Sequence, residues 1–278
     1  MNPPMPTIPF GQHRVSRLII GGNPFSGNSH VCDELSREMR DYFTTETIKK
    51  TLRDCEAAGI NTIQARGDAH IARVLNEFRN EGGNLQWIAQ TASELADQKR
   101  HIRSLASLGA IGVYHHGSRT DNFWHEGRIG EVAEYLKIMR DAGVSVGLGT
   151  HIPEVIAHAE ERGWDVDFYM ACVYNLNRRK RESAIVAGPG ADAGSEKFFV
   201  EDRDRMLATI RATPKTCLAF KILAAGRHCA TPETTREAVH YALAGIKPTD
   251  AIVVGMFPKF RDQVAENARW VTEFDALQ

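Results

Sequence analysis

Residues 142–151, AGVSVGLGTH, show the organisation that recurs along this chain: a helical pattern stops at a glycine, and a short apolar run follows and ends in polar residues. The same order occurs in residues 57–64, AAGINTIQ, and in residues 108–116, LGAIGVYHH. The glycine fits the left-handed position that closes a helix, and the apolar run is typical of a buried parallel strand. Polar side chains are therefore expected at the C-terminal ends of several parallel strands.

Eight such strands can be placed, and helical patterns lie between most of them. Eight alternations predict one α/β domain over residues 1–278, a (β/α)8 TIM barrel. A doubly wound open sheet is the alternative, but no Gly-x-Gly-x-x-Gly pattern follows the first strand. Long loops at about residues 23–43 and 177–199 are expected over the C-terminal face. The predicted strands are Leu18–Gly22, Asn61–Ala65, Gln86–Gln90, Gly112–His116, Ser145–Gly149, Phe168–Val173, Cys217–Ile222 and Ala251–Gly255.

Composition narrows the class of protein. The 278 residues are 42% hydrophobic and carry a net charge of −1, which is typical of a soluble globular protein and gives no electrostatic footprint for nucleic acid or a membrane surface. No apolar run approaches the ~18 residues of a membrane span. The five cysteines are scattered, with no CxxC pair, which argues against a disulfide framework. We expect a cytoplasmic protein with a small-molecule substrate; the oligomeric state is not predicted.

Four segments resemble the aldo-keto reductase superfamily, in the same order along the chain. They are VSRLIIGG at 15–22, AGIN at 58–61, YNL at 174–176 with Arg178, and VVGM at 253–256 followed by QVAEN at 263–267. The resemblance implies a (β/α)8 barrel that reduces carbonyl compounds with NADPH through an Asp, a Tyr, a Lys and a His.

Most of that catalytic tetrad is missing. The Asp position falls at Gln64, the Tyr meets RGDAH at 66–70, and the Lys position falls at Thr91. Only the His is retained, as His116 or its neighbour His115. Because a lysine-activated tyrosine is the family's proton donor, its loss removes the usual acid.

The cofactor positions are also altered. The family's Ser-Asn pair becomes Thr150-His151, its Gln becomes Ala171, and its stacking Tyr becomes Phe220, which can still stack. We therefore expect NADP(H) to bind weakly or not at all. Residues that stand where the family holds the adenine and its phosphate are Lys259, Glu266 and Asn267.

A group of polar residues falls at or just past the predicted strand ends: Asp68, His70, His116 and His151. Imidazoles with one carboxylate are ligands for Zn²⁺, Mn²⁺ or Fe²⁺, so these four form a candidate metal site. The metal-free alternative is that they bind substrate hydroxyls or exchange protons. A purely structural role is the third alternative.

Lys221 interrupts an apolar strand, where an unpaired lysine is costly to bury. It is a candidate Schiff-base lysine, catalytic base or cationic clamp, and the alternative is a structural salt bridge. Arg66 is expected to stabilise developing negative charge beside it, and Tyr174 is a candidate proton donor. The residues expected to bind substrate are Gln64, Gln90, Asn175 and Trp124, and Arg119 and Asp121 are further candidates at the rim.

These observations predict an enzyme that performs acid–base chemistry, as an isomerase, epimerase or lyase, on a small sugar-like or carbonyl substrate, with or without a metal. His116 is the expected central acid or base, and His115 is expected on the opposite face of its strand. One alternative is an NADP-dependent oxidoreductase with a rearranged proton donor. Another is a non-catalytic barrel that senses a ligand.

Overall fold

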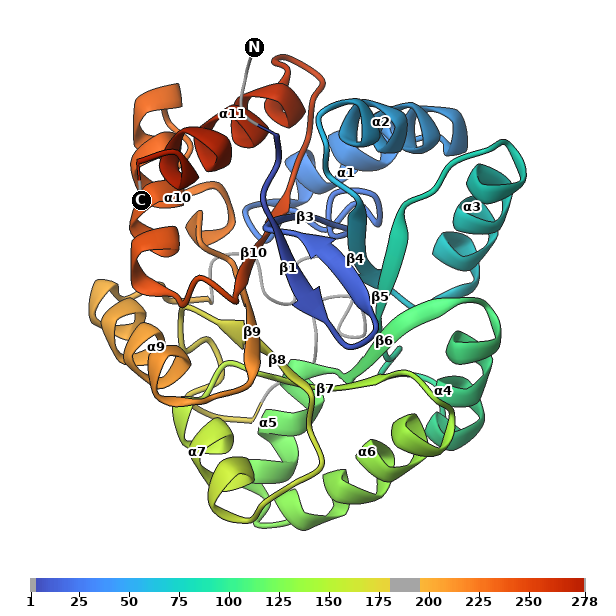
Figure 1. Ribbon diagram of the computed structural model, residues 1–278, viewed down its shortest axis with the longest axis vertical. Helices are drawn as coiled ribbons and strands as arrows, with labels where there is room; N and C mark the ends of the chain where they lie inside the picture. The colour runs from blue at the N-terminus through green and yellow to red at the C-terminus, as the bar shows by residue number, and fades with distance from the viewer. Residues whose placement is uncertain (1–3, 181–195, 278) are drawn as a thin grey trace.

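The computed structural model describes residues 4–180 and 196–277, and its main feature is a closed barrel of eight parallel strands in the order β10-β3-β4-β5-β6-β7-β8-β9 (Figure 1). This confirms the predicted (β/α)8 fold. Each predicted strand is present, two of them with the predicted bounds and six with an end shifted by one or two residues. The strands are β3 (Leu18–Gly21), β4 (Thr62–Arg66), β5 (Gln86–Gln90), β6 (Ala110–His115), β7 (Ser145–Thr150), β8 (Phe168–Cys172), β9 (Thr216–Phe220) and β10 (Ala251–Gly255).

Helices surround the barrel and connect its strands (Figure 1). The glycines that mark the recurring motif, Gly59, Gly109 and Gly143, have φ angles of 81°, 83° and 76°, as a helix-closing position requires. The helices are α1 (Asp33–Tyr42), α2 (Thr45–Ala57), α3 (Ala69–Asn80), α4 (Gln98–Ser107), α5 (Gly117–His125), η1 (Ile129–Glu131), α6 (Val132–Asp141), α7 (Pro153–Glu161), α9 (Val200–Ala212), η2 (Ala224–Gly226), α10 (Pro232–Gly245) and α11 (Gln263–Asp275).

An antiparallel hairpin that the sequence analysis did not identify closes the N-terminal end of the barrel. It consists of β1 (Thr7–Phe10) and β2 (His13–Ser16) and lies across the barrel opening in Figure 1. Ile8, Phe10 and Val15 are buried in the same interior cluster as side chains of the barrel strands. The barrel is therefore plugged at one end, and its C-terminal end is the mouth.

The first of the two predicted long loops contains a helix. Between β3 and α2 the chain forms helix α1, in which Leu35 and Met39 lie one turn apart and turn toward the barrel mouth. The spacing of four residues between Leu35 and Met39 is the helical period, which places both side chains on one face of α1. In the second segment, residues 181–195 lie outside the described part of the chain.

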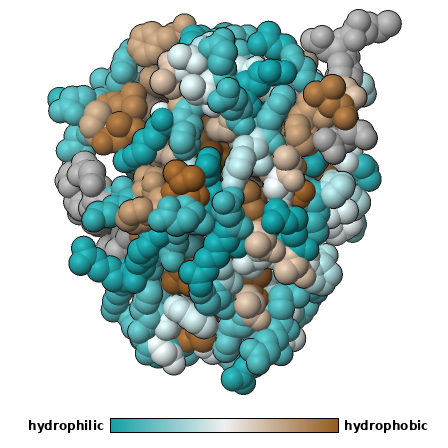
Figure 2. Space-filling model, turned by 90° about the vertical axis from the view of Figure 1, so that its left-hand side faces the viewer, coloured by the Kyte–Doolittle hydropathy of each residue, from teal (hydrophilic) through white to brown (hydrophobic). Residues whose placement is uncertain are grey.

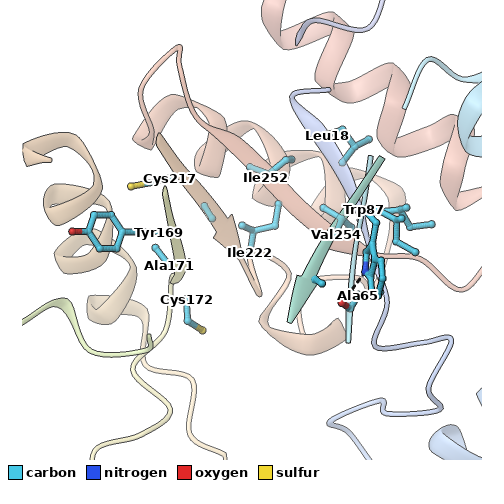
Figure 3. Close-up of a cluster of buried hydrophobic side chains, with 14 of the residues drawn as sticks. Leu18, Ala65, Trp87, Tyr169, Ala171, Cys172, Cys217, Ile222, Ile252 and Val254 are labelled. Atoms are coloured by element: carbon cyan, nitrogen blue, oxygen red, sulfur yellow. Dashed lines mark hydrogen bonds between the residues drawn. The ribbon is translucent and has the colours of Figure 1, made fainter. Parts of the chain in front are cut away.

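The outward faces of the strands form the main core with the helices. Figure 3 shows part of it, including Leu18, Ile252 and Val254 from neighbouring strands. There the Trp87 indole Nε1 donates to the Ala65 carbonyl at 3.2 Å, so this buried polar group is paired. The opposite side chains of the same strands point into the barrel, which is how β4, β6 and β7 carry polar groups to the mouth.

The face of the molecule seen in Figure 2 is mostly hydrophilic. On the face seen in Figure 2, hydrophobic residues occur in small scattered groups among hydrophilic ones. Within residues 4–180 and 196–277, none of the helices has both the length and the apolar character that a membrane span requires.

Candidate active site at the barrel mouth

The floor of the mouth is a buried tyrosine. Tyr114, on β6, points into the barrel, and its hydroxyl accepts hydrogen bonds from the Nε2 amides of Gln64 at 2.8 Å and Gln90 at 2.9 Å. Burial raises the pKa of Tyr114 well above its ordinary value, so the phenol stays protonated. Two predicted substrate-binding residues, Gln64 and Gln90, thus support this phenol through their side-chain amides.

The β6–β7 side of the mouth contains a buried pair of imidazole and carboxylate. His151 directly follows β7, and its Nδ1 lies 2.7 Å from Oδ2 of Asp121, which comes from helix α5. The same carboxylate accepts from the Thr150 hydroxyl at 2.5 Å and from the His151 backbone N–H at 3.2 Å. Asp121 is fully buried and His151 is 5% exposed. The contact with this carboxylate therefore holds the imidazole in position.

His115 and His116 lie next to each other but have different surroundings. His115 ends β6 and faces the helices: its Nδ1 contacts the Thr120 hydroxyl at 2.7 Å, and its ring stacks on Tyr135 at 5.1 Å. Burial lowers its pKa to about 3, so it is neutral at physiological pH. His116 is the N-cap residue of α5, and its backbone N–H donates to the Thr91 hydroxyl at 3.1 Å. The orientation of His115 agrees with the alternation of side chains along a strand, whereas the catalytic role of His116 stays a prediction.

Lys221 stands at the other side of the mouth. Strand β9 ends at Phe220, so Lys221 is the first residue after the strand, with a φ of 60°, and does not interrupt it as predicted. Its Nζ lies 3.2 Å from Oε1 of Glu196 and 3.4 Å from Nδ1 of His30. The Glu196 side chain is 2% exposed, and its Oε1 lies 3.2 Å from the His30 ring. The lysine is thus held in a cluster with one carboxylate and one imidazole, drawn from three separate loops.

A cavity of about 390 Å³ begins at this side of the mouth and extends to helix α11. At the mouth it is lined by Gln64, Phe220 and Lys221. Its walls are formed by the segment with α1, by the turn at residues 223–226, and by the end of β10. At its far end it is lined by Arg261, Gln263, Glu266, Asn267 and Trp270. The cavity therefore extends from Gln64, Phe220 and Lys221 at the mouth to Glu266 and Asn267. The family resemblance places these last two residues beside the adenine and its phosphate.

The far end of the cavity holds an acceptor that lacks a donor. Asn267 is 3% exposed, its Nδ2 donates to the Gln263 carbonyl at 2.7 Å, and its Oδ1 has no hydrogen-bond partner among the described residues. Beside it the Arg261 guanidinium forms two hydrogen bonds with the Glu266 carboxylate, at 2.8 and 3.2 Å. Lys259 does not line the cavity but pairs with Glu38 of α1 at 2.7 Å.

The candidate metal ligands do not converge. Asp68 caps helix α3 by accepting from the Ile71 N–H at 2.9 Å, and His70 is exposed on that helix. His151 uses Nδ1 for Asp121, and His116 begins a different helix. In the part of the chain that the structure describes, no three His, Cys, Asp or Glu side chains are grouped so as to hold a metal ion. The metal site inferred from strand-end positions was wrong, because the cap and the helix turn Asp68 and His70 away.

Other predicted residues also have structural surroundings. Tyr174 is buried, with its hydroxyl 3.1 Å from His228 Nε2, and burial raises its pKa. The Asn175 Oδ1 accepts from the Asn177 N–H at 3.2 Å. Trp124 packs edge-on against His158 at 5.6 Å in the helical layer and does not line the cavity. The Arg66 side chain is 5% exposed and pairs with Asp68 and Glu94, so its role in charge stabilisation stays a prediction.

Two residues of the site escaped sequence reasoning, and the partner of a third was not foreseen. Tyr114 was hidden inside an apolar strand, although its alternation with Gly112 places it inside the barrel. Glu196 ends a long segment with no local pattern, so nothing in the sequence signalled its contact with Lys221. Asp121 was a rim candidate, but its pairing with His151 depends on how α5 packs beside β7.

Comparisons with known proteins agree with the fold. The sequence matches no protein-family model and no curated protein. Among solved structures, the aldo-keto reductase AKR11C1 from Bacillus halodurans in its holo form is 14% identical, with a TM-score of 0.57 over 96% of this chain and 91% of that one. A truncated 3-deoxy-D-arabino-heptulosonate 7-phosphate synthase from Thermotoga maritima is 11% identical, with a TM-score of 0.56 over 99% and 92%.

A third similar structure, the glycerol dehydrogenase AKR11B4 from Gluconobacter oxydans, is 12% identical, with a TM-score of 0.53 over 98% of this chain and 94% of that one. Identities this low show a shared fold and carry no activity across to this chain. The chain is a divergent TIM barrel whose fold is similar to that of aldo-keto reductases and other TIM-barrel enzymes.

Proposed function

We propose that this protein is an oxidoreductase that binds a nicotinamide dinucleotide in the cavity and acts on a small carbonyl or polyhydroxylated compound at the barrel mouth. The observation that carries the proposal is the continuity of the cavity from Phe220 to the buried acceptor of Asn267. The proposal departs from the expectation of weak NADP(H) binding. That expectation rested on the replacement of the family's cofactor-binding residues at Thr150, His151 and Ala171, and it took no account of the shape of the cavity.

The lining of the cavity suits the three chemical parts of such a cofactor. Phe220 presents an aromatic ring at the mouth, where a planar heterocycle would stack. The cations along the cavity are Lys221 and Arg261, each paired with a carboxylate, and at Ala225 and Gly226 the wall has only a methyl group or a hydrogen. Phosphates could approach the wall closely there. At the far end, the Asn267 Oδ1 would accept from an amino group such as that of adenine.

The chain's own residues then have separate tasks. A bound nicotinamide would supply or accept a hydride. Phe220 would orient it, and the Lys221 ammonium would stabilise negative charge that develops on a substrate oxygen. The Tyr114 floor limits how deeply a substrate can enter. A proton donor must also be present at the mouth, and the candidate imidazoles are His116, His151 and His30, the last of which lies beside Lys221.

Titration of the purified protein with NADH and NADPH, followed by nucleotide fluorescence and by thermal unfolding, tests the proposal. We expect saturable binding with a Kd in the micromolar range and a rise in Tm. Phe220→Leu should weaken binding about fivefold while leaving the Tm of the free protein within a few degrees. Absence of binding at 1 mM nucleotide would refute the proposal.

Cofactor-independent acid–base chemistry is the second candidate, and the buried pair of His151 and Asp121 favours it. Such an enzyme would exchange the hydrogen beside a substrate carbonyl without nucleotide. Proton NMR of dihydroxyacetone or an aldose in D₂O would detect that exchange. Exchange by a protein that binds no nucleotide would favour this candidate over the oxidoreductase.

A further inference from the structure

We infer that His151, held by Asp121, is the proton donor and acceptor of this site and takes the place of the missing tyrosine. The inference deepens the proposed function and rests on it for the identity of the reaction. Its basis is the geometry at the end of β7, where the imidazole and the carboxylate form a preassembled pair.

The direction of the imidazole comes from its neighbours. Positions 147, 149 and 151 alternate with Val146 and Leu148, whose side chains face outward. His151 therefore belongs to the inner face of the strand. The His151 ring meets Phe220 edge to face, with centroids 5.6 Å apart, and Phe220 lines the cavity. Nδ1 is directed to Asp121, so Nε2 lies on the other edge of the ring, away from the carboxylate.

The carboxylate is held in one position by its contacts with the end of β7. Asp121 accepts from the Thr150 hydroxyl and from the His151 backbone N–H, and its Oδ2 lies 2.7 Å from His151 Nδ1. A carboxylate so held stabilises the positive charge of a protonated ring and selects the neutral tautomer with hydrogen on Nδ1. Asp121 and Thr150 are positioning residues in this arrangement, and His151 is the catalytic residue.

The proton balance follows directly. In reduction, the carbonyl carbon gains a hydride from the bound cofactor, the π electrons move to oxygen, and Nε2–H of protonated His151 gives its proton to that oxygen. The ring becomes neutral and regains a proton from water. In oxidation, neutral Nε2 would take the hydroxyl proton while the hydride passes from carbon to the oxidised nicotinamide.

His115 shows why position alone does not assign this role. It is also a buried histidine at a strand end, but its partner is a hydroxyl, its ring is covered by Tyr135, and its pKa of about 3 keeps it neutral. An imidazole that stays neutral at physiological pH cannot donate a proton in turnover.

The test combines activity with two readouts that do not depend on turnover. His151→Gln should lower kcat at least 100-fold, with Kd for NADH or NADPH within threefold of wild type. Asp121→Asn should lower kcat by a similar factor and flatten the pH profile of kcat. In ¹⁵N NMR of the free protein, wild-type His151 should carry hydrogen on Nδ1, and Asp121→Asn should move it to Nε2. His13→Gln, in the hairpin at the closed end, is the matched control and should keep full activity.

Loss of kcat below tenfold in His151→Gln would overturn the inference, as would a wild-type ring with its hydrogen on Nε2. If Asp121→Asn does not fold, Thr150→Val and His151→Gln still test it. If wild type binds no nucleotide, the proposed oxidoreductase fails separately, and the dyad is judged by deuterium exchange in dihydroxyacetone. His151→Gln should then abolish that exchange, and unchanged exchange, or none in wild type, would sink the dyad as well.

Discussion

The two sides of the barrel mouth are both polar, but their polar groups are used differently. On the β6–β7 side, consecutive residues of α5 serve the two strand-end histidines: Thr120 contacts His115, and Asp121 contacts His151. On the β9–β10 side the charged groups line a cavity, and the Asn267 Oδ1 lacks a donor among the described residues. On the first side, the contacts described above join side chains of the protein to one another, whereas the second side borders the cavity. Substitutions on the first side should therefore cost stability as well as turnover, and those on the second should cost affinity.

The largest effect is expected at Asp121. Asp121→Ala removes a buried carboxylate that accepts from three donors and should lower the free energy of unfolding by about 3 kcal/mol. Thr120→Val, which removes one hydroxyl partner of His115, should cost about 1 kcal/mol. Urea unfolding measures both. Equal losses of unfolding free energy in the two variants would show that the Asp121 carboxylate contributes no more to stability than the Thr120 hydroxyl.

Stability should also depend on pH through His115. Its pKa falls from 6.5 to about 3 on folding, so the unfolded chain binds the proton more readily. The contribution of the neutral ring is complete above pH 6.5 and is lost as pH falls toward about 3. Between pH 6.5 and 5 the loss should approach ~2 kcal/mol, at ~1.4 kcal/mol per pKa unit. His115→Gln should remove this part of the slope in parallel unfolding titrations, and identical slopes would contradict the assignment.

A smaller effect, on affinity, is expected at Asn267. Asn267→Ala deletes the acceptor at the far end of the cavity and should weaken nucleotide binding about tenfold, which corresponds to ~1.4 kcal/mol. The amide also donates to the Gln263 carbonyl, so Asn267→Asp is a useful second variant. Fluorescence titration and thermal unfolding separate the two effects. A large loss of stability with unchanged affinity would place Asn267 among the packing residues.

The smallest effect is expected at Glu266. Its carboxylate is hydrogen-bonded to the Arg261 guanidinium. The additional phosphate group of NADPH would compete with this carboxylate for Arg261. Glu266→Gln should improve binding of NADPH relative to NADH by about two- to fivefold. The ratio of the two dissociation constants is the measurement. A shift toward NADH would mean that Arg261 does not face the part of the nucleotide in which the two cofactors differ.

The barrel could be predicted because its signals are local. A glycine after a helix and an apolar run before polar residues are each set by backbone geometry within a few residues. Three strands follow this pattern, and all eight predicted strands are present. The β1–β2 hairpin escaped because its short strands gain their stability from packing into the barrel end, which no local pattern reports.

The site was less accessible to the same reasoning. Placement of Gln64, His116 and His151 near the mouth follows from strand ends alone. Their partners do not, because Asp121 reaches His151 across 30 residues and Glu196 reaches Lys221 across 25. Asp68 and His70 show the converse error: they follow a strand end, but a helix begins at once and carries them away from the mouth.

The hairpin that plugs the N-terminal end has a kinetic consequence. Ile8, Phe10 and Val15 fill that opening, so molecules must enter and leave through the mouth. With the cavity opening onto the same mouth, a dinucleotide that extends to Phe220 would lie beneath any substrate bound above it. Substrate would then arrive after the cofactor, and product would have to leave before the cofactor could exchange. Initial-rate measurements should accordingly show a compulsory order of addition, in which the product form of the cofactor inhibits competitively with its substrate form.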